Sequence, residues 1–400
     1  MKRILALVLV LALLLCGCGG DAPVETTVPE TTAAPTTEPT TEPTTVPTEP
    51  PVVHRNPLNG EILDEPFTDR PVMVSITNTE DTIPHVGIIN ADMFFEALMS
   101  RGVIRCAALF TDISDLEAIG AIRSTRLLTN QLAFHYDAVL IHGGGFDQVL
   151  HDAKGKGLDH FNVDSLYRQG DPFAKATAYR DKTYDRWAPN NLFGYGPGIL
   201  DYLENNEIRM TQDADKDYGL SFVDDATPAD GQIADEIKIT FGQNLKSTTM
   251  VYNEETGKYT YHQYGKMMTD QVTGLPEEFN NVIIMRADVY ENFIYQEANF
   301  QCGGTGYYAC GGKLIPIVWE CAEPEKLVSP FRFMTEDGQQ LDINVGNSYV
   351  AIINYFNEVQ WNEIIPEPTV PETTEATVPE TTAETVPEIT EQAVAETTEN

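Results

Sequence analysis

The stretch DAVLIHGGGF, residues 137–146, joins a short apolar run to three consecutive glycines. We predict a buried strand over 137–141, a turn at 142–145 and a short helix near 146–153. A strand that leads through a glycine-rich turn into a helix is typical of α/β domains, whose ligand sites lie at the carboxyl ends of strands. The stretch therefore favours a layered α/β fold and marks His142, Gly143 and Gly144 as candidate ligand-binding residues.

The flanking sequence continues this alternation. Strands are predicted at 71–77 (PVMVSIT) and 105–111 (RCAALFT), and helices at 91–100 (ADMFFEALMS), from 124 or 125 to about 134, and at 199–205. From residue 237 onward the pattern becomes mostly β, with strands predicted at 237–241, 249–253, 259–264, 281–285, 314–320, 331–334 and 349–353. We therefore expect an N-terminal α/β domain over 53–235 and a mostly antiparallel β-rich domain over 236–362, an α+β chain overall.

The N-terminus predicts the cellular location of the protein. Lys2 and Arg3 precede an apolar run over 4–15 that is short for a membrane span. Leu15-Cys16-Gly17-Cys18 resembles the lipobox of bacterial lipoproteins, which implies a signal peptide over 1–17, diacylation of Cys18, palmitate among the chains, and anchoring on the extracytoplasmic face of the cell membrane. Cys16 is the weaker candidate, because Leu15 is a poor residue at a cleavage site. An ordinary secretion signal is the alternative.

Two Thr/Pro/Glu-rich segments flank the folded part. Residues 18–52 form the predicted lipid-anchored linker and 363–400 an acidic tail, and both lack the apolar content needed to form a core. The whole chain of 400 residues carries a net charge of −36. Such an acidic chain disfavours nucleic acid as a partner. The membrane, through the anchor, and a cell-wall component or envelope protein are the partners that we expect.

Four cysteines remain beyond the signal region: Cys106, Cys302, Cys310 and Cys321. Export permits disulfides, and Cys302 could pair with Cys310 across a Gly-rich turn. Four cysteines allow three pairings, and free thiols are an equal alternative. No metal-ligand spacing such as C-x-x-C is present, so no metal and no cofactor is expected.

Arg123-Ser124-Thr125-Arg126 is the strongest local signal of a ligand site. Two arginines three apart share one face if the segment is helical, and they would lie beside a helix N-terminus. Guanidinium groups bind carboxylate or phosphate in bidentate fashion. The alternative is that the pair neutralises an internal carboxylate, such as Glu96, Asp112 or Asp115.

Three more residues complete the candidate set. His142 could act in acid/base catalysis with Asp147 or Glu96 as the carboxylate, although a turn with a satisfied histidine is the commoner arrangement. Asn78 ends a predicted strand and could face the same crevice. Glu96 lies among apolar residues, so we expect it to pair with Arg105, Arg123 or Arg126.

Short motifs in a fixed order resemble the YerB-like family of bacterial lipoproteins, both halves of which are classed as domains of unknown function. They are Asn56-Pro57-Leu58-Asn59-Gly60, Arg70-Pro71, Ala91-Asp92, Gly102 to Arg105, Ile119 to Arg126, His142-Gly143-Gly144, Arg186 to Leu192, Gly303 to Tyr307 and Val318-Trp319. Asn190 departs from the family pattern, because a histidine is expected there. The resemblance covers nearly all of 56–355. It implies a cellular location for the protein but no enzymatic reaction.

Two functions follow from these observations. We favour a cell-surface lipoprotein that binds an anionic envelope ligand or a protein partner, because no recognised catalytic motif is present. The alternative is a cell-envelope hydrolase or transferase that uses His142 and a carboxylate, with the arginine pair holding an anionic substrate.

Overall fold

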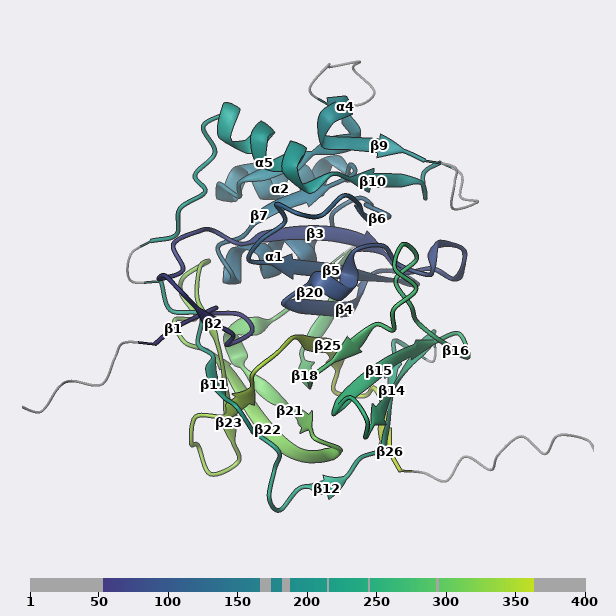
Figure 1. Cartoon of the computed structure of the whole chain (residues 1–400), viewed down its shortest axis with the longest axis vertical. Helices are drawn as coiled ribbons and strands as arrows, with labels where there is room; N and C mark the ends of the chain where they lie inside the picture. The colour runs from purple at the N-terminus through teal and green to yellow at the C-terminus, as the bar shows by residue number, and fades with distance from the viewer. Residues whose placement is uncertain are drawn as a thin grey trace, which may run out of the picture. The chain divides into compact units, whose positions relative to one another are not determined.

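A mixed β-sheet forms the centre of the molecule (Figure 1). The structure, a computed structural model, describes residues 53–165, 174–181, 188–213, 216–243, 245–292 and 295–362. In these ranges the sheet has thirteen strands. Its main path runs β12 (Gln232–Ile233), β22 (Lys313–Cys321), β21 (Gly304–Cys310), β18 (Asn281–Ala287), β25 (Ser348–Asn354), β4 (Met93–Ser100), β5 (Val103–Phe110), β3 (Val72–Thr77), β7 (Val139–His142) and β8 (His160–Asn162). Beside it lie β19 (Val289–Asn292), β20 (Tyr295–Ala298) and β23 (Phe331–Thr335).

The central strands are buried on both faces. In β3, β4 and β7 nearly every residue is inaccessible to solvent, and their sequences are continuous apolar runs rather than alternating patterns. Such runs are typical of strands whose two faces are both covered. β7 runs parallel to β3 and to β8, so the carboxyl ends of these three strands meet at one edge of the sheet.

The predicted helix over 91–100 is wrong, because this segment is strand β4. It pairs with β5 on one side and β25 on the other. Short apolar runs do not distinguish a buried strand from a buried helix by periodicity. The remaining elements agree with the sequence pattern to within a few residues.

Smaller sheets and helices cover the central sheet. A six-stranded sheet contains β16 (Lys266–Met267), β15 (Lys258–Gln263), β14 (Lys246–Asn253), β13 (Glu236–Phe241) and β26 (Val359–Trp361), with β17 (Glu278–Phe279) beside β15. A three-stranded sheet contains β6 (Ile119–Gly120), β10 (Leu192–Gly194) and β9 (Ala178–Arg180). Two pairs are β1 (His54–Arg55) with β2 (Ile62–Leu63), and β11 (Ser221–Val223) with β24 (Asp342–Asn344). The α-helices described are α1 (Leu127–His135), α2 (Asp147–Lys156), α4 (Ala174–Thr177) and α5 (Gly196–Asn205).

Two apolar cores lie on opposite faces of the sheet. One contains Ile76, Phe94 and Ile141 with α5 and the six-stranded sheet, and the other contains Phe95 and Leu140 with α1. Alternate residues of one strand therefore supply both cores, as the period of two in a strand requires. The observed architecture confirms the predicted combination of an α+β N-terminal part with a β-rich C-terminal part.

The two predicted domains share this sheet. β25, from the C-terminal part, lies between β18 and β4, so residues from both sides of position 235 hydrogen-bond directly. The boundary itself stays a prediction. The predicted signal peptide, Cys18, the linker and the acidic tail lie outside the described residues.

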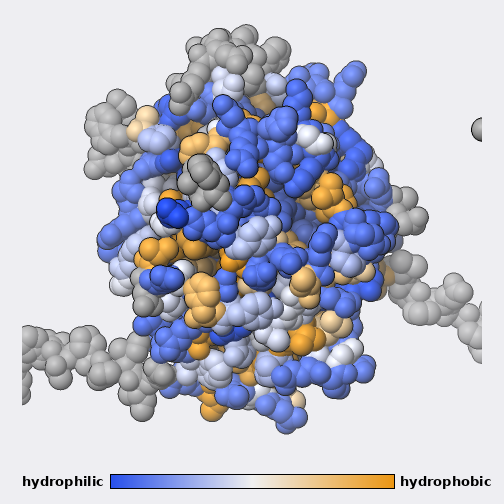
Figure 2. Space-filling model, turned by 180° about the vertical axis from the view of Figure 1, so that it is seen from behind, coloured by the Kyte–Doolittle hydropathy of each residue, from blue (hydrophilic) through white to orange (hydrophobic). Residues whose placement is uncertain are grey.

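The four cysteines beyond the signal region are free thiols, and Cys302 is the exposed one. The possible Cys302–Cys310 disulfide is therefore not formed. Of the helices described, none has the length and apolarity to cross a membrane. The face of the molecule shown in Figure 2 mixes hydrophilic residues with scattered apolar ones.

Candidate functional site

A cleft of about 450 Å³ lies at the carboxyl ends of β7 and β8. Its position is the one that open α/β sheets use for ligands. The lining residues come from five separate segments: Ile122, Arg123, Ser124, Gly143, Gly144, Gly145, Asn162, Asp164, Ser165, Arg180, Pro189 and Leu192.

The arginine-bearing segment is extended where it enters the cleft. The backbone N–H of Arg123 donates to Ser75 at 2.9 Å, and the Arg123 carbonyl accepts from Gly143 at 3.0 Å. The segment thus lies between the end of β3 and the glycine turn after β7. Because α1 begins only at Leu127, the segment is not helical and Arg123 and Arg126 do not share a helical face, although Arg126 does lie at the helix N-terminus.

The glycine turn keeps this wall of the cleft open. Gly144 has a φ of 93°, which side chains of L residues rarely adopt, and its N–H donates to Asn162 Oδ1 at 2.9 Å. A Cβ at Gly143 would lie 2.9 Å from Leu192 Cδ2. The three glycines predicted from the sequence therefore serve a turn into which larger residues do not fit.

Two guanidinium groups give the cleft its positive charge. Arg123 donates to the side chain of Asn190, which in turn donates to Asp81 at 2.6 Å. Arg180 pairs with Asp164 and donates to Asn191 Oδ1 at 2.9 Å. Burial lowers the pKa of Arg123; Arg180 lowers it further, whereas Asp81 and Asp164 raise it.

The structure separates the remaining predicted site residues from this cleft. The Arg126 guanidinium lies over the Phe146 ring, 5.2 Å from its centroid, and donates to the Thr125 carbonyl at 2.7 Å. Asp147 is exposed at the first position of α2. Asn78 belongs to the Glu96 network described below.

His142 is fully buried beneath the glycine turn. Its Nδ1 donates to the Gly144 carbonyl at 2.7 Å, and its Nε2 lies 2.9 Å from Nδ1 of His160. Because a carbonyl only accepts, Nε2 of a neutral His142 is the acceptor toward His160. Burial, and next to it His160, lowers the pKa of His142 to about 4. The contact between His142 and His160 depends on β7 and β8 being parallel neighbours, which the sequence pattern does not indicate.

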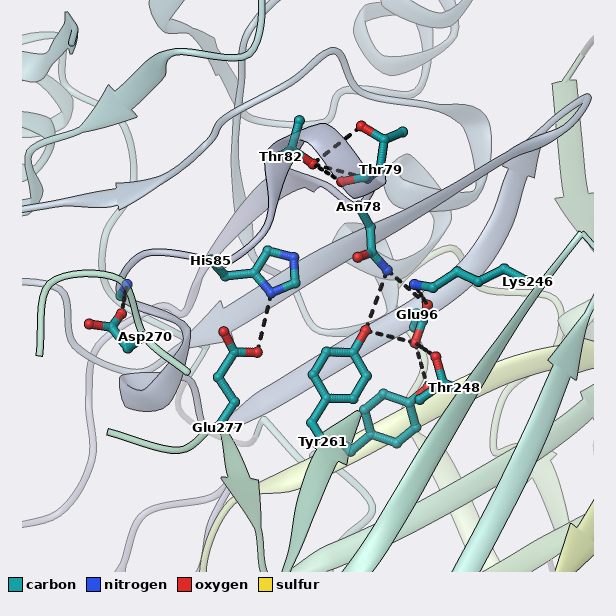
Figure 3. Close-up of polar contacts among 12 residues, drawn as sticks. Asn78, Thr79, Thr82, His85, Glu96, Lys246, Thr248, Tyr261, Asp270 and Glu277 are labelled. Carbon is teal, nitrogen blue, oxygen red and sulfur yellow. Dashed lines mark hydrogen bonds and ion pairs between the residues drawn. The ribbon is translucent and has the colours of Figure 1, made fainter. Parts of the chain in front are cut away.

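Glu96, on β4, lies at the centre of a buried polar network (Figure 3). In the sheet, β5 and β3 separate β4 from β7 and the cleft. Oε1 accepts from Asn78 at 2.8 Å and from Lys246 Nζ at 2.5 Å. Oε2 accepts from three hydroxyl groups at 2.7 to 3.0 Å: Thr248, Tyr261 and Tyr349. Both carboxylate oxygens are therefore saturated, and His142 is not among their partners.

The expected pairing of Glu96 with Arg105, Arg123 or Arg126 is wrong, since Lys246 is the cation. Burial raises the pKa of Glu96, but the Lys246 charge and the hydrogen bonds from Lys246, Tyr349 and Thr248 outweigh it and lower the pKa overall. No signal in the N-terminal half indicates this partner, because Lys246 lies 150 positions further along the chain.

A second buried pair lies near this network and was not singled out from the sequence. His85 Nδ1 and Glu277 Oε2 are 3.2 Å apart, and both side chains are fully buried. The His85 ring stacks on Tyr261 with centroids 6.4 Å apart. This pair therefore also joins the two halves of the chain.

Sequence reasoning also missed Asn162, Asp164 and Arg180 in the cleft. Asn162 ends β8, the parallel neighbour of β7, so it could have been found by asking which strand follows α2. Searched over the described ranges, the side chains of His, Cys, Asp and Glu form no group of three or more that could hold a metal ion.

Comparison with known proteins gives consistent matches. Residues 58–209 match the N-terminal domain, and residues 237–350 the C-terminal domain, of the protein family of unknown function DUF3048. A protein of Bacillus subtilis (strain 168) named "Putative lipoprotein YerB" is 24% identical over 303 residues, which cover 74% of this chain and 85% of that protein. The crystal structure of YerB from Bacillus subtilis superposes with a TM-score of 0.63 at 20% identity, and the match covers 76% of this chain and 99% of that one.

Proposed function

Because the chain belongs to the DUF3048 family, whose two domains it carries in order, we propose that it is a lipid-anchored protein of the cell envelope that binds an anionic ligand. The anchor is Cys18, and the ligand site is the cleft at the ends of β7 and β8.

The anchor is supported by the lipobox and by the relative whose name describes it as a lipoprotein. Diacylation of Cys18 would place the folded part on the extracytoplasmic face of the membrane. Cys18→Ala should release the chain from membranes into the medium, whereas Cys16→Ala should leave it membrane-bound. Fractionation of cells that express either variant, with detection of the chain by antibody, tests this assignment. Retention of the Cys18→Ala chain in the membrane would refute it.

The ligand assignment rests on one observation: Arg123 and Arg180 line the same cleft beside the Gly143–Gly145 turn. Guanidinium groups in a partly desolvated cleft bind carboxylate or phosphate more strongly than they do in water. Glycines let a ligand approach the backbone closely. The acidic remainder of the chain repels polyanions.

Envelope fragments provide the test. Carboxylate-bearing peptidoglycan fragments and phosphate-bearing teichoic-acid fragments are titrated separately into the full-length chain in detergent. Arg123→Ala should weaken binding by about 10- to 100-fold, the range expected for one charge-assisted hydrogen bond. Arg101→Ala is the matched control, because Arg101 is an exposed arginine paired with Glu291. Equal affinity of the Arg123→Ala and Arg101→Ala chains would remove the cleft from the proposal.

The alternative, an envelope hydrolase, has less support. It requires a reactive His142 beside Asp147 or Glu96, whereas both nitrogens of His142 are engaged and Glu96 is saturated by other donors. Hydrolysis of the same fragments by the wild-type chain, lost in His142→Asn, would favour the enzyme over the binding protein.

A further inference from the structure

Arg105, on β5, is a buried arginine with unused hydrogen-bond donors. Its side chain is 5% exposed, and its Nε and Nη1 atoms are buried without a hydrogen-bond partner. A buried guanidinium without an acceptor is costly, because both its charge and its N–H groups have lost water. Such a group calls for an acceptor that the described protein atoms do not supply.

The position of Arg105 follows from strand register. It lies opposite Ala97 on β4 and Thr77 on β3, so it points to the face of the sheet that α1 covers. Glu96 points to the other face. The Glu96 carboxylate is therefore separated from Arg105 by the sheet itself.

Arg126 adds a second positive charge beside Arg105. It is 6% exposed, and within the described residues its guanidinium donates to neutral groups: Ser100 Oγ and the carbonyls of Ser124 and Thr125. Ser100 lies opposite Val103 on β5, two positions before Arg105, which brings the two arginines to the same end of β5. Burial is the main cause that lowers the pKa of Arg105 to about 9, and the charges of Arg126 and then Arg123 lower it further. Across the described ranges, no carboxylate forms an ion pair with Arg105 or Arg126.

The N-terminus of α1 adds positive potential at the same place. Arg126 is the N-cap residue, its side chain makes no capping hydrogen bond, and the first turn contains no acidic residue. Helix N-termini favour anions through their unpaired N–H groups and the helix dipole. Here the helix begins at Arg126, which carries a guanidinium group, and no acidic side chain lies in its first turn.

We propose that Arg105, Arg126 and the first turn of α1 bind a small oxyanion, of which inorganic phosphate is the simplest example. The site is separate from the cleft, because neither Arg105 nor Arg126 lines the cleft. The oxyanion would accept hydrogen bonds from Nε and Nη1 of Arg105 and offset the charge that the two arginines share. It does not depend on the proposed envelope ligand.

Thermal unfolding with inorganic phosphate tests this site. The melting temperature of the full-length chain in detergent is measured with 50 mM phosphate and with chloride at equal ionic strength. Phosphate should raise the melting temperature of the wild type by about 2 to 5 °C, because a ligand that binds the folded state stabilises it. Arg105→Met should abolish this rise, and Arg105→Lys, which keeps the charge but loses the planar fork, should reduce it.

Two controls keep the outcome specific. Arg101→Ala, in the turn between β4 and β5, should retain the full rise. Arg123→Ala reports on the cleft instead: a rise that is lost in Arg123→Ala and kept in Arg105→Met would place the phosphate in the cleft and overturn the proposal. No rise in the wild type, or an equal rise in the wild type and the Arg105→Met chain, would overturn the proposal. If Arg105→Met does not fold, the Arg105→Lys comparison decides in the same way.

Discussion

Replacement of Glu96 by glutamine should destabilise the fold strongly. The change preserves the shape of the side chain but removes the carboxylate that pairs with the Lys246 ammonium, which is 4% exposed. Breaking a buried ion pair by removing one partner costs about 3 to 5 kcal/mol, because the other charge stays buried and uncompensated. For a folded part of this size, that cost lowers the melting temperature by about 5 to 8 °C.

A double-mutant cycle separates the pair from the rest of the network. Lys246→Met alone leaves Glu96 with its amide and hydroxyl donors, and the combined Glu96→Gln/Lys246→Met chain buries neither charge of this pair. The double variant should therefore be more stable than Glu96→Gln, with a coupling free energy of at least about 2 kcal/mol. Guanidinium chloride unfolding, followed by circular dichroism and tryptophan fluorescence, measures all four chains. A cost below about 1 kcal/mol for Glu96→Gln, or strictly additive effects, would refute the account of this network.

Three further predictions concern the stability of the fold in acid, the effect of two glycine substitutions and the accessibility of the cysteine thiols. Burial, followed by His160, depresses the pKa of His142 to about 4, so the unfolded chain binds the extra proton first and stability should fall by about 2 kcal/mol between pH 7 and pH 5. Urea titrations should show a smaller loss in His142→Asn and an unchanged loss in the variant at exposed His151, His151→Gln. Gly198→Ala would place a Cβ 1.8 Å from a backbone carbonyl oxygen and should cost more than about 2 kcal/mol, whereas Gly155→Ala meets open space in a helix and should gain about 0.5 to 1 kcal/mol; melting curves that show equal effects would contradict this. Maleimide labelling of the native chain, mapped by mass spectrometry, should modify Cys302 and spare the three buried thiols of the folded part, which should react only after denaturation.

Local sequence pattern predicted the strands and helices around the cleft well. Residues 137–146 contain both the apolar run and the glycines of the turn, so strand β7, the glycine turn and the start of helix α2 can be predicted from this one local stretch. Gly143, Gly144, Arg123 and Ser124 line one cleft, because it is built where adjacent strands end, whereas His142, Arg126 and Asn78 do not line it.

Long-range pairing accounts for most of what the sequence did not reveal. Segment 91–100 has helical spacing of apolar residues, but its two neighbours in the sheet cover both of its faces and favour a strand. Glu96 pairs with Lys246 and not with Arg105, because alternate residues of a strand face opposite sides of a sheet and Arg105 faces the side opposite to Glu96. No pattern within the N-terminal half shows which residue of β14 lies next to Glu96.

The position of β25 bears on how the chain acquires its structure as it is synthesised. β4 lies early in the sequence, yet one of its two main partner strands begins only at Ser348. Until that residue has been added, β4 has an open edge of unpaired amides and Glu96 lacks the Tyr349 hydroxyl. Folding of the N-terminal half cannot be completed while the chain is still growing, so a quality-control protease or holdase would meet an exposed apolar strand for most of synthesis. A stop codon anywhere before position 348 should therefore yield an insoluble or degraded product rather than a shorter folded protein.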